Sequence, residues 1–155
     1  MKLINKNLIY KILVSVFTFS SIFINSGCVS VAPVYYEDDK KTAQKKVEEF
    51  HQYYNDKNFK EMYKLMSAET QKVLSEEMFV QKFEKTYTDL GKIIKSDSVK
   101  SDVKPQAASR LVTFIYETEF QNGKLEEKFV CSTDGKQAFI EIYDQPNKVR
   151  SKASQ

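Results

Sequence analysis

Histidine and cysteine, the side chains that most often act as metal ligands or nucleophiles, are rare in this sequence. Its 155 residues include one histidine, His51, and two cysteines, Cys28 and Cys131. A zinc site takes several such ligands, and a nucleophile needs a base beside it. As a general base, His51 would need an orienting partner, and the sequence names none. We therefore expect no catalytic residue, no metal and no cofactor. His51 is expected to be a structural residue at the surface or half-buried, so that replacing it changes little.

Glutamates in the second half of the chain could supply acid–base chemistry if they were buried. A buried carboxyl group has a raised pKa, as proton abstraction requires. These glutamates alternate with apolar residues along predicted strands, which is typical of a solvated outer face. Placing them inside would also gather several like charges in one small cavity. We expect the following four on the outer face: Glu117, Glu119, Glu127 and Glu141.

Aromatic residues on the predicted strands could have either of two roles. In one strand, alternate positions place five side chains on one face: Val112, Phe114, Tyr116, Thr118 and Phe120. We expect this face to be core, packed on helices, because aromatic side chains bury large areas. The alternative is an apolar pocket with a tyrosine hydroxyl as its polar group. The candidate pocket lining is then Phe114, Tyr116, Phe129 and Tyr143.

The N-terminus has the organisation of an export signal. Residues 1–11 carry positive charge and no acid, and residues 12–24 form an apolar run of 13 residues. As a helix this run spans about 20 Å, less than the roughly 30 Å of a bilayer core. The pattern predicts a secretory signal peptide over residues 1–27. An uncleaved membrane anchor is the alternative.

The end of this segment resembles the lipobox of bacterial lipoproteins, on the residues Ser26, Gly27 and Cys28. Asn25 departs from the pattern, which usually has an aliphatic residue there. The resemblance implies cleavage between Gly27 and Cys28, followed by attachment of diacylglycerol and an N-acyl chain, such as palmitate, to Cys28. Several acyl chains anchor a protein firmly. An ordinary signal peptide with an incidental cysteine is the alternative.

Localisation and charge follow from the same segment. Val29 replaces the aspartate that retains lipoproteins at the inner membrane, which implies the outer membrane, facing the periplasm, in a Gram-negative source. Residues 1–28 hold 3 lysines and no acid, so 24 − 3 = 21 basic residues face 21 acidic ones in the mature chain. A nearly neutral domain without a basic stripe is not expected to bind nucleic acid.

The second cysteine has no intramolecular partner once Cys28 is acylated. Cys131 lies in a predicted strand, so we expect a buried small hydrophobic residue. A reactive thiol or an intermolecular disulfide remains open.

The mature chain divides into three parts. Residues 28–40 form a predicted lipidated tether, because Pro33 and a run of acids interrupt any regular pattern. Residues 41–145 form one domain, and residues 146–155 a polar tail. Helical periodicity predicts helices over 41–54, 59–66 and 75–90, with residues 67–70 as a connection and Val73 and Leu74 as a buried turn.

Strand signals begin after Gly91. The sequence predicts strands over 92–103, 109–120, 124–133 and 136–144. Asn122-Gly123 and Asp134-Gly135 are strong hairpin signals between them. The expected fold class is α+β, with about three N-terminal helices packed on a curved antiparallel sheet of about four strands.

This order of elements resembles the nuclear-transport-factor-2-like superfamily, also called the cystatin-like cone, and within it small exported bacterial domains of unknown function. The resemblance covers residues 50–143. It implies a sheet wrapped around the long helix, leaving a cone-shaped pocket that binds a ligand, hosts catalysis or is filled by side chains. Its landmarks are Phe50 to Tyr54, the helix start Asp56 to Phe59, Leu90-Gly91 and the two hairpins.

Taken together, these observations predict a membrane-tethered lipoprotein of the cell envelope. Its partners are expected to be the membrane, through the lipid, and either an envelope protein or a small apolar ligand. A small-molecule carrier or sensor is the first alternative. The second is an enzyme of the isomerase or dehydratase kind that uses a pocket tyrosine or glutamate.

Overall fold

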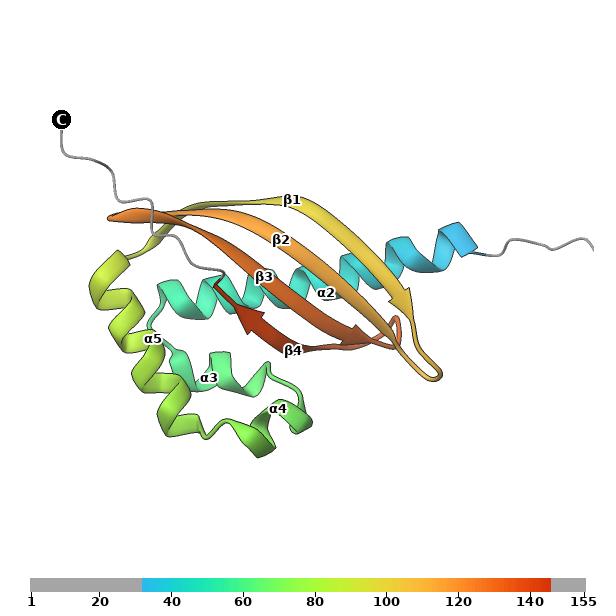
Figure 1. The fold of residues 1–155 in the computed structure, drawn as a ribbon, viewed down its shortest axis with the longest axis horizontal. Coiled ribbons are helices and arrows are strands. Elements are labelled where there is room, and N and C mark those ends of the chain that lie inside the picture. Colours follow the sequence, from blue (N-terminus) through green and yellow to red (C-terminus); the bar gives the residue numbers. More distant parts are fainter. Residues whose placement is uncertain (1–31, 146–155) are drawn as a thin grey trace, which may run out of the picture. The chain divides into compact units, whose positions relative to one another are not determined.

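The computed structural model describes residues 32–145, with side chains from Tyr36 onward. The predicted signal peptide with Gly27, the predicted acylation site Cys28 and the predicted tail 146–155 lie outside the described residues. The described elements are α2 (Ala32–Asn55), α3 (Phe59–Lys64), α4 (Ala68–Val73), α5 (Glu76–Leu90), β1 (Ile93–Pro105), β2 (Arg110–Phe120), β3 (Gly123–Thr133) and β4 (Ala138–Asp144). The expected α+β class is confirmed, since helices pack on a curved four-stranded antiparallel sheet (Figure 1).

The sheet is a simple meander, in which each strand pairs with its neighbours in the sequence. Both predicted hairpins are present. Phe120 pairs with Gly123 across the β2–β3 turn. In the β3–β4 turn, Gly135 takes a φ of 88°, which suits glycine, and the Asp134 carboxylate accepts the N–H groups of Lys136 and Gln137 at 2.8 Å.

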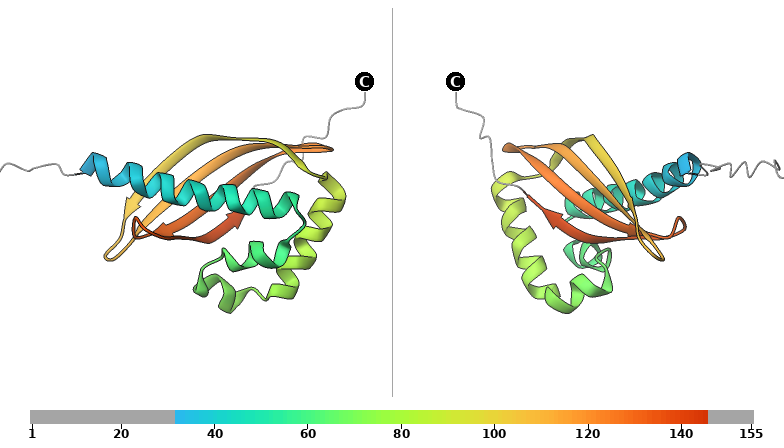
Figure 2. Two further views of the ribbon diagram at one scale, coloured as in Figure 1. Left: turned by 180° about the vertical axis from the view of Figure 1, so that it is seen from behind. Right: turned by 45° about the vertical axis from the view of Figure 1, so that its right-hand side comes forward.

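Helix α2 crosses the concave inner face of the sheet and contacts all four strands (Figure 2). Its buried residues recur at helical spacing and include the four predicted ones: Ala43, Val47, Phe50 and Tyr54. They pack against the inner faces of β2 and β3, where the predicted core face from Val112 to Phe120 is confirmed.

The helix begins at Ala32 rather than at Lys41, so residues 36–40 belong to the folded domain and not to a tether. The cause is a contact that no local pattern reveals. Asp39 is fully buried, and its Oδ2 lies 3.1 Å from Nε of Arg110 at the start of β2. This ion pair fixes the first turns of α2 to the sheet.

Helices α3, α4 and α5 form a second helical layer beside β4 and the C-terminal half of α2 (Figures 1 and 2). Ser75 caps α5 as predicted, accepting the N–H of Met78 at 3.3 Å. Helix α4 stands where a connection was expected, and Ser67 caps it. The prediction of a buried turn at Val73 is wrong, because the last turn of α4 points that side chain outward, leaving it 86% exposed.

The two edges of the sheet differ. At β4, the segment between α3 and α4 adds a short parallel bridge. The N–H of Ile140 donates to the Leu65 carbonyl, and the N–H of Ser67 donates to the Ile140 carbonyl, both at 2.9 Å. Strand β1 forms the other edge. It carries two register shifts and several charged residues, features that discourage pairing with a foreign strand.

Gly91 joins the helical layer to the sheet. Its φ of 75° ends α5, and its N–H donates to the Tyr87 carbonyl at 2.8 Å. A Cβ added there would lie 2.5 Å from Oε1 of Gln121. The positive φ and the close approach of the Gln121 side chain therefore both favour glycine at this corner.

Candidate functional site

A row of hydrogen-bonded polar side chains crosses the inner face of the sheet, one from each strand. Ser96 of β1 bonds Thr118 of β2, with their hydroxyl oxygens 2.8 Å apart. The Thr118 hydroxyl donates to Oε2 of Glu127 on β3. The Tyr143 hydroxyl of β4 donates to Oε1 of Glu127 at 2.7 Å. We call these four residues, together with His51, the polar network.

His51 completes the network from the helix that covers the sheet. It lies on α2, and its Nε2 donates to Oε2 of Glu127 at 3.0 Å. Its side chain is 11% exposed and that of Glu127 is 2% exposed. The imidazole also packs edge-on against the rings of Tyr116 and Phe129. The orienting partner that the sequence did not reveal is therefore Glu127.

The register of the sheet explains why these residues meet. Tyr116 lies opposite Glu127, so Thr118 is a diagonal neighbour of that glutamate. On the other side Phe129 lies opposite Tyr143, which is again diagonal to Glu127. Diagonal pairs are separated by about 7–8 Å at their backbones, a distance that long side chains can bridge.

Electrostatics makes Glu127 a carboxylate despite its burial. Desolvation raises the pKa of this carboxyl group. The hydrogen bond and charge of His51, with the hydroxyls of Thr118 and Tyr143, outweigh that effect and hold the pKa below its ordinary value. Both oxygens accept hydrogen bonds, so the buried charge is compensated.

Burial keeps the neighbouring acids protonated. Burial, reinforced by the negative charge of Glu127, raises the pKa of the Tyr143 hydroxyl well above its usual value. Burial likewise raises the pKa of Tyr116 and of Cys131 to about 12 each. Cys131 is 0% exposed, which confirms the predicted buried residue, and a protonated buried thiol is a poor nucleophile.

The structure corrects one prediction about the glutamates. Glu127 does not face solvent: the residue is 1% exposed. It lies on the same face of β3 as the buried residues Leu125, Phe129 and Cys131. Glu117 is exposed as expected. Glu119 is half-buried on the outer face of β2. Glu141 is half-buried at the β4 edge, where its carboxylate accepts a hydrogen bond from the Ser67 hydroxyl at 2.5 Å.

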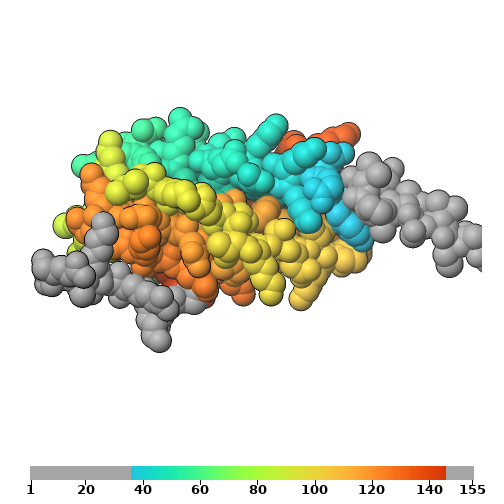
Figure 3. Space-filling model, turned by 90° about the horizontal axis from the view of Figure 1, so that it is seen from above, coloured from blue at the N-terminus to red at the C-terminus, as the bar shows by residue number. Residues whose placement is uncertain are grey.

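The four residues proposed as pocket lining belong to the packed interior instead. Phe129 is fully buried, Phe114 and Tyr116 nearly so, and Tyr143 is half-buried against the same cluster. Phe50 fills the space between them and α5, with its ring centre 5.2 Å from that of Phe129 and 5.0 Å from that of Tyr143. Seen from above, α2 and β1 lie side by side on the surface of the domain (Figure 3).

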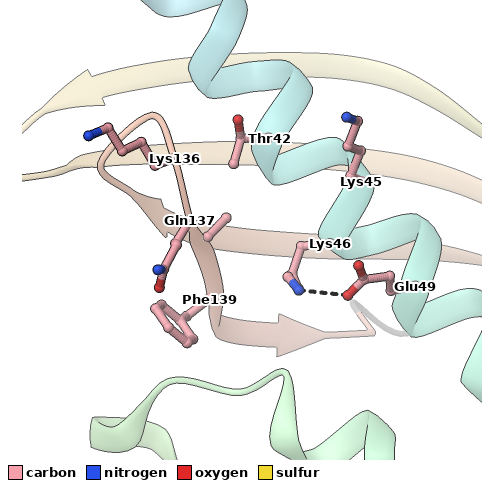
Figure 4. Close-up of a pocket in the computed structure, with 8 residues that line it drawn as sticks. Thr42, Lys45, Lys46, Glu49, Lys136, Gln137 and Phe139 are labelled. Atoms are coloured by element: carbon pink, nitrogen blue, oxygen red, sulfur yellow. Dashed lines mark hydrogen bonds and ion pairs between the residues drawn. The ribbon is translucent and has the colours of Figure 1, made fainter.

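A hollow of about 310 Å³ lies on the opposite flank of α2, facing the β3–β4 turn (Figure 4). We call it the lysine groove. It is lined by Thr42, Lys45, Lys46 and Glu49 of α2 and by Lys136, Gln137, Ala138 and Phe139. Lys46 is paired with Glu49 at 2.6 Å, whereas neither Lys45 nor Lys136 forms an ion pair with another residue of the described part of the chain. Phe139 is 45% exposed. Sequence reasoning did not find this groove.

Within residues 32–145 no cluster of three or more potential metal ligands occurs, and no helix has the length and apolarity to cross a bilayer. The chain matches no protein-family model and no curated protein. Its candidate sites therefore rest on the geometry alone: a closed polar network inside the domain and an open lysine groove on its surface.

Proposed function

We propose that this protein is a lipid-anchored lipoprotein of the cell envelope whose cone-type domain binds a partner protein through its surface. The observation that carries the proposal is the filling of the cone. The rings of Phe50, Phe129 and Tyr143 pack against one another between α2 and the sheet, with centres 5.0–5.2 Å apart, in the region where the resemblance implies a cone-shaped pocket. A domain with a filled interior can recognise a partner only from outside.

The placement of α2 supports a domain held close to its anchor. The helix begins at Ala32, so four residue steps separate it from Cys28. Fully extended, four steps reach at most about 14 Å. A lipid on Cys28 would therefore keep the start of α2 near the bilayer surface.

Lipid anchoring is tested with the full-length chain expressed in a bacterium that processes lipoproteins. We expect wild-type protein in the membrane fraction, with a mass that fits an acylated Cys28 at the N-terminus. Cys28→Ala should yield a folded domain released from the membrane. Retention of this variant in the membrane fraction would show that another segment is the anchor.

Binding is tested by native mass spectrometry of the protein extracted in mild detergent. A co-purifying polypeptide is the expected result, and a photo-cross-linker placed at Gln137 in the groove should capture the same polypeptide. A reproducible small-molecule adduct would instead support a carrier or sensor and would contradict surface binding.

One observation favours a second candidate, an enzyme of the isomerase or dehydratase kind. The 3.0 Å contact between His51 and Glu127 has the form of an oriented acid–base pair. It is the weaker candidate because Glu127 already accepts from three donors and Nε2 of His51 is engaged. If His51→Gln abolished the function of a variant that remained folded and membrane-bound, this candidate would replace the first.

A further inference from the structure

We propose that the lysine groove binds an extended acidic peptide segment of the partner, which pairs through its main chain with the edge of β4 at Ala138. This inference names the site and the chemistry of the surface recognition proposed above, and it rests on that proposed function. It is carried by three features of the groove: positive charge outside any ion pair, an unpaired main-chain edge and an exposed aromatic ring.

Charge is the first feature. Three lysines and one glutamate line the groove, and the glutamate is neutralised by Lys46 at 2.6 Å. Lys45 on α2 and Lys136 on the turn form no ion pair among the described residues, and they lie on the two sides of the hollow (Figure 4). The nearby Asp134 carboxylate accepts main-chain N–H groups of its own turn, and these bonds, with a smaller effect of the Lys136 charge, hold its pKa below the ordinary value. A ligand that brings carboxylates to both sides would complement this surface.

The main-chain edge is the second feature. Ile140 directs its N–H and carbonyl away from β3, to Leu65 and Ser67. Groups two residues apart on a strand point to the same side, so Ala138 directs its N–H and carbonyl to the same edge. The bond from the Asp134 N–H to the Gln137 carbonyl agrees with this alternation. Outside the pairing of β3 with β4, no main-chain hydrogen bond within residues 32–145 involves Ala138, and the alternation turns its two groups away from that pairing.

Burial makes the unpaired edge significant. Ala138 lines the hollow but is only 3% exposed, so its main-chain groups are shielded from bulk water as well as unpaired. Shielded main-chain groups without a partner are rare in folded proteins, because leaving them unbonded costs free energy. A ligand that supplies their hydrogen bonds would recover this free energy on binding.

A peptide strand is the ligand that satisfies charge and edge together. An extended segment offers a carbonyl and an N–H to Ala138, in the manner of strand addition to a sheet edge. Its side chains alternate, so acidic residues on one side reach the lysines while an apolar neighbour reaches Phe139, the third feature. A phosphate or a lipid headgroup would satisfy the lysines but would leave the Ala138 carbonyl without a donor.

The test uses the full chain in mild detergent and a fluorescent, end-blocked peptide that alternates glutamate and valine. We expect saturable binding by fluorescence anisotropy, and none with the peptide in which lysine replaces glutamate. Lys45→Glu combined with Lys136→Glu should weaken binding about tenfold or more, as lost charge pairs at a surface imply. The matched control, Lys92→Glu with Lys100→Glu, makes the same charge change at exposed positions outside the groove and should leave binding unchanged.

Hydrogen exchange of single amides locates the peptide. Slower exchange of the Ala138 amide in the bound state supports the proposal. Protection of β1 amides instead would place the peptide on the other edge and overturn it. Competition by inorganic phosphate, or by phosphatidylglycerol vesicles, as strong as that of unlabelled peptide would also overturn it, since the groove would then be a simple anion site or a membrane contact. These outcomes are independent of the Cys28→Ala result, so failure of the anchor and failure of the groove are distinguishable.

Discussion

The two flanks of α2 place polar side chains against the sheet in opposite ways. On one flank His51 reaches Glu127 in a network where each carboxylate oxygen is bonded and solvent is excluded. On the other flank Lys45 is exposed, and Phe139 lines the same groove with 45% of its surface exposed. The first arrangement uses its hydrogen-bonding capacity inside the domain, whereas the second leaves it available to a ligand.

The difference originates in the course of β4. Its pairing with β3 has a register shift where Glu141 lies between Ile140 and Ile142. Before the shift, Ala138 and Ile140 face inward. After it, Tyr143 faces inward and donates to Glu127. One bulge therefore directs the end of β4 into the closed network, while its beginning remains an unpaired edge beside the groove.

Loss of Glu127 from the polar network should have the largest effect on the stability of the domain. Glu127→Ala removes the acceptor shared by His51, Thr118 and Tyr143 and breaks the ion pair with His51, so it should lower the free energy of unfolding by about 3–5 kcal/mol. Urea denaturation of the full chain measures this. The control is Glu126→Ala, which removes the neighbouring exposed carboxylate and should have little effect. Equal effects of the two variants would mean that the network is not closed.

Loss of His51 should have the next largest effect. The sequence alone predicted that His51→Ala changes little, but the structure shows its Nε2 bonded to a buried carboxylate. Removing a hydrogen bond to a charged group costs about 1.5–3 kcal/mol. Gln52→Ala, at the adjacent exposed position, is the matched control for helix propensity. A change for His51→Ala no larger than the control would restore the original prediction.

Lowering the pH should reduce the stability that the polar network contributes, by a smaller amount and gradually. The pKa of Glu127 is lower in the folded protein than its ordinary value of about 4.3. Its stabilising effect is therefore complete above that ordinary value and is lost as pH falls through the lower, folded pKa. Melting temperatures measured from neutral to acidic pH should fall more steeply for wild type than for Glu127→Gln. Parallel curves would show that Glu127 does not titrate across this range.

Local patterns predicted the fold well and the network poorly. The helix faces, the strands and both hairpins follow from periodicity and turn residues that act within a few positions of each other. Parity alone could have placed Glu127 inside, because Leu125 and Phe129 flank it on the same side of β3. Glu127 was nevertheless predicted to face solvent, because its side chain is charged. The compensating donors, His51, Thr118 and Tyr143, come from three other elements, and only the tertiary register brings them together.

Two further differences have the same cause. The acids before Lys41 were interpreted as a break, but Asp39 is stabilised by Arg110, a residue 71 positions away. Helix α4 is too short to show an apolar stripe, and its stability comes from Ser67 and from the bond between the Thr70 hydroxyl and the Glu141 carbonyl at 2.7 Å. The lysine groove was missed because its walls are distant in sequence and neither wall alone has a binding motif.

The open flank should show the smallest effect on folding and thereby complete the comparison. Lys45→Ala with Lys136→Ala removes two charges that form no ion pair among residues 32–145, so the urea midpoint should stay at its wild-type value. Binding of the acidic peptide should weaken in the same protein. A clear loss of stability would mean that these lysines hold α2 to the β3–β4 turn. The groove would then be structural like the network on the other flank, and the contrast between the two flanks would fail.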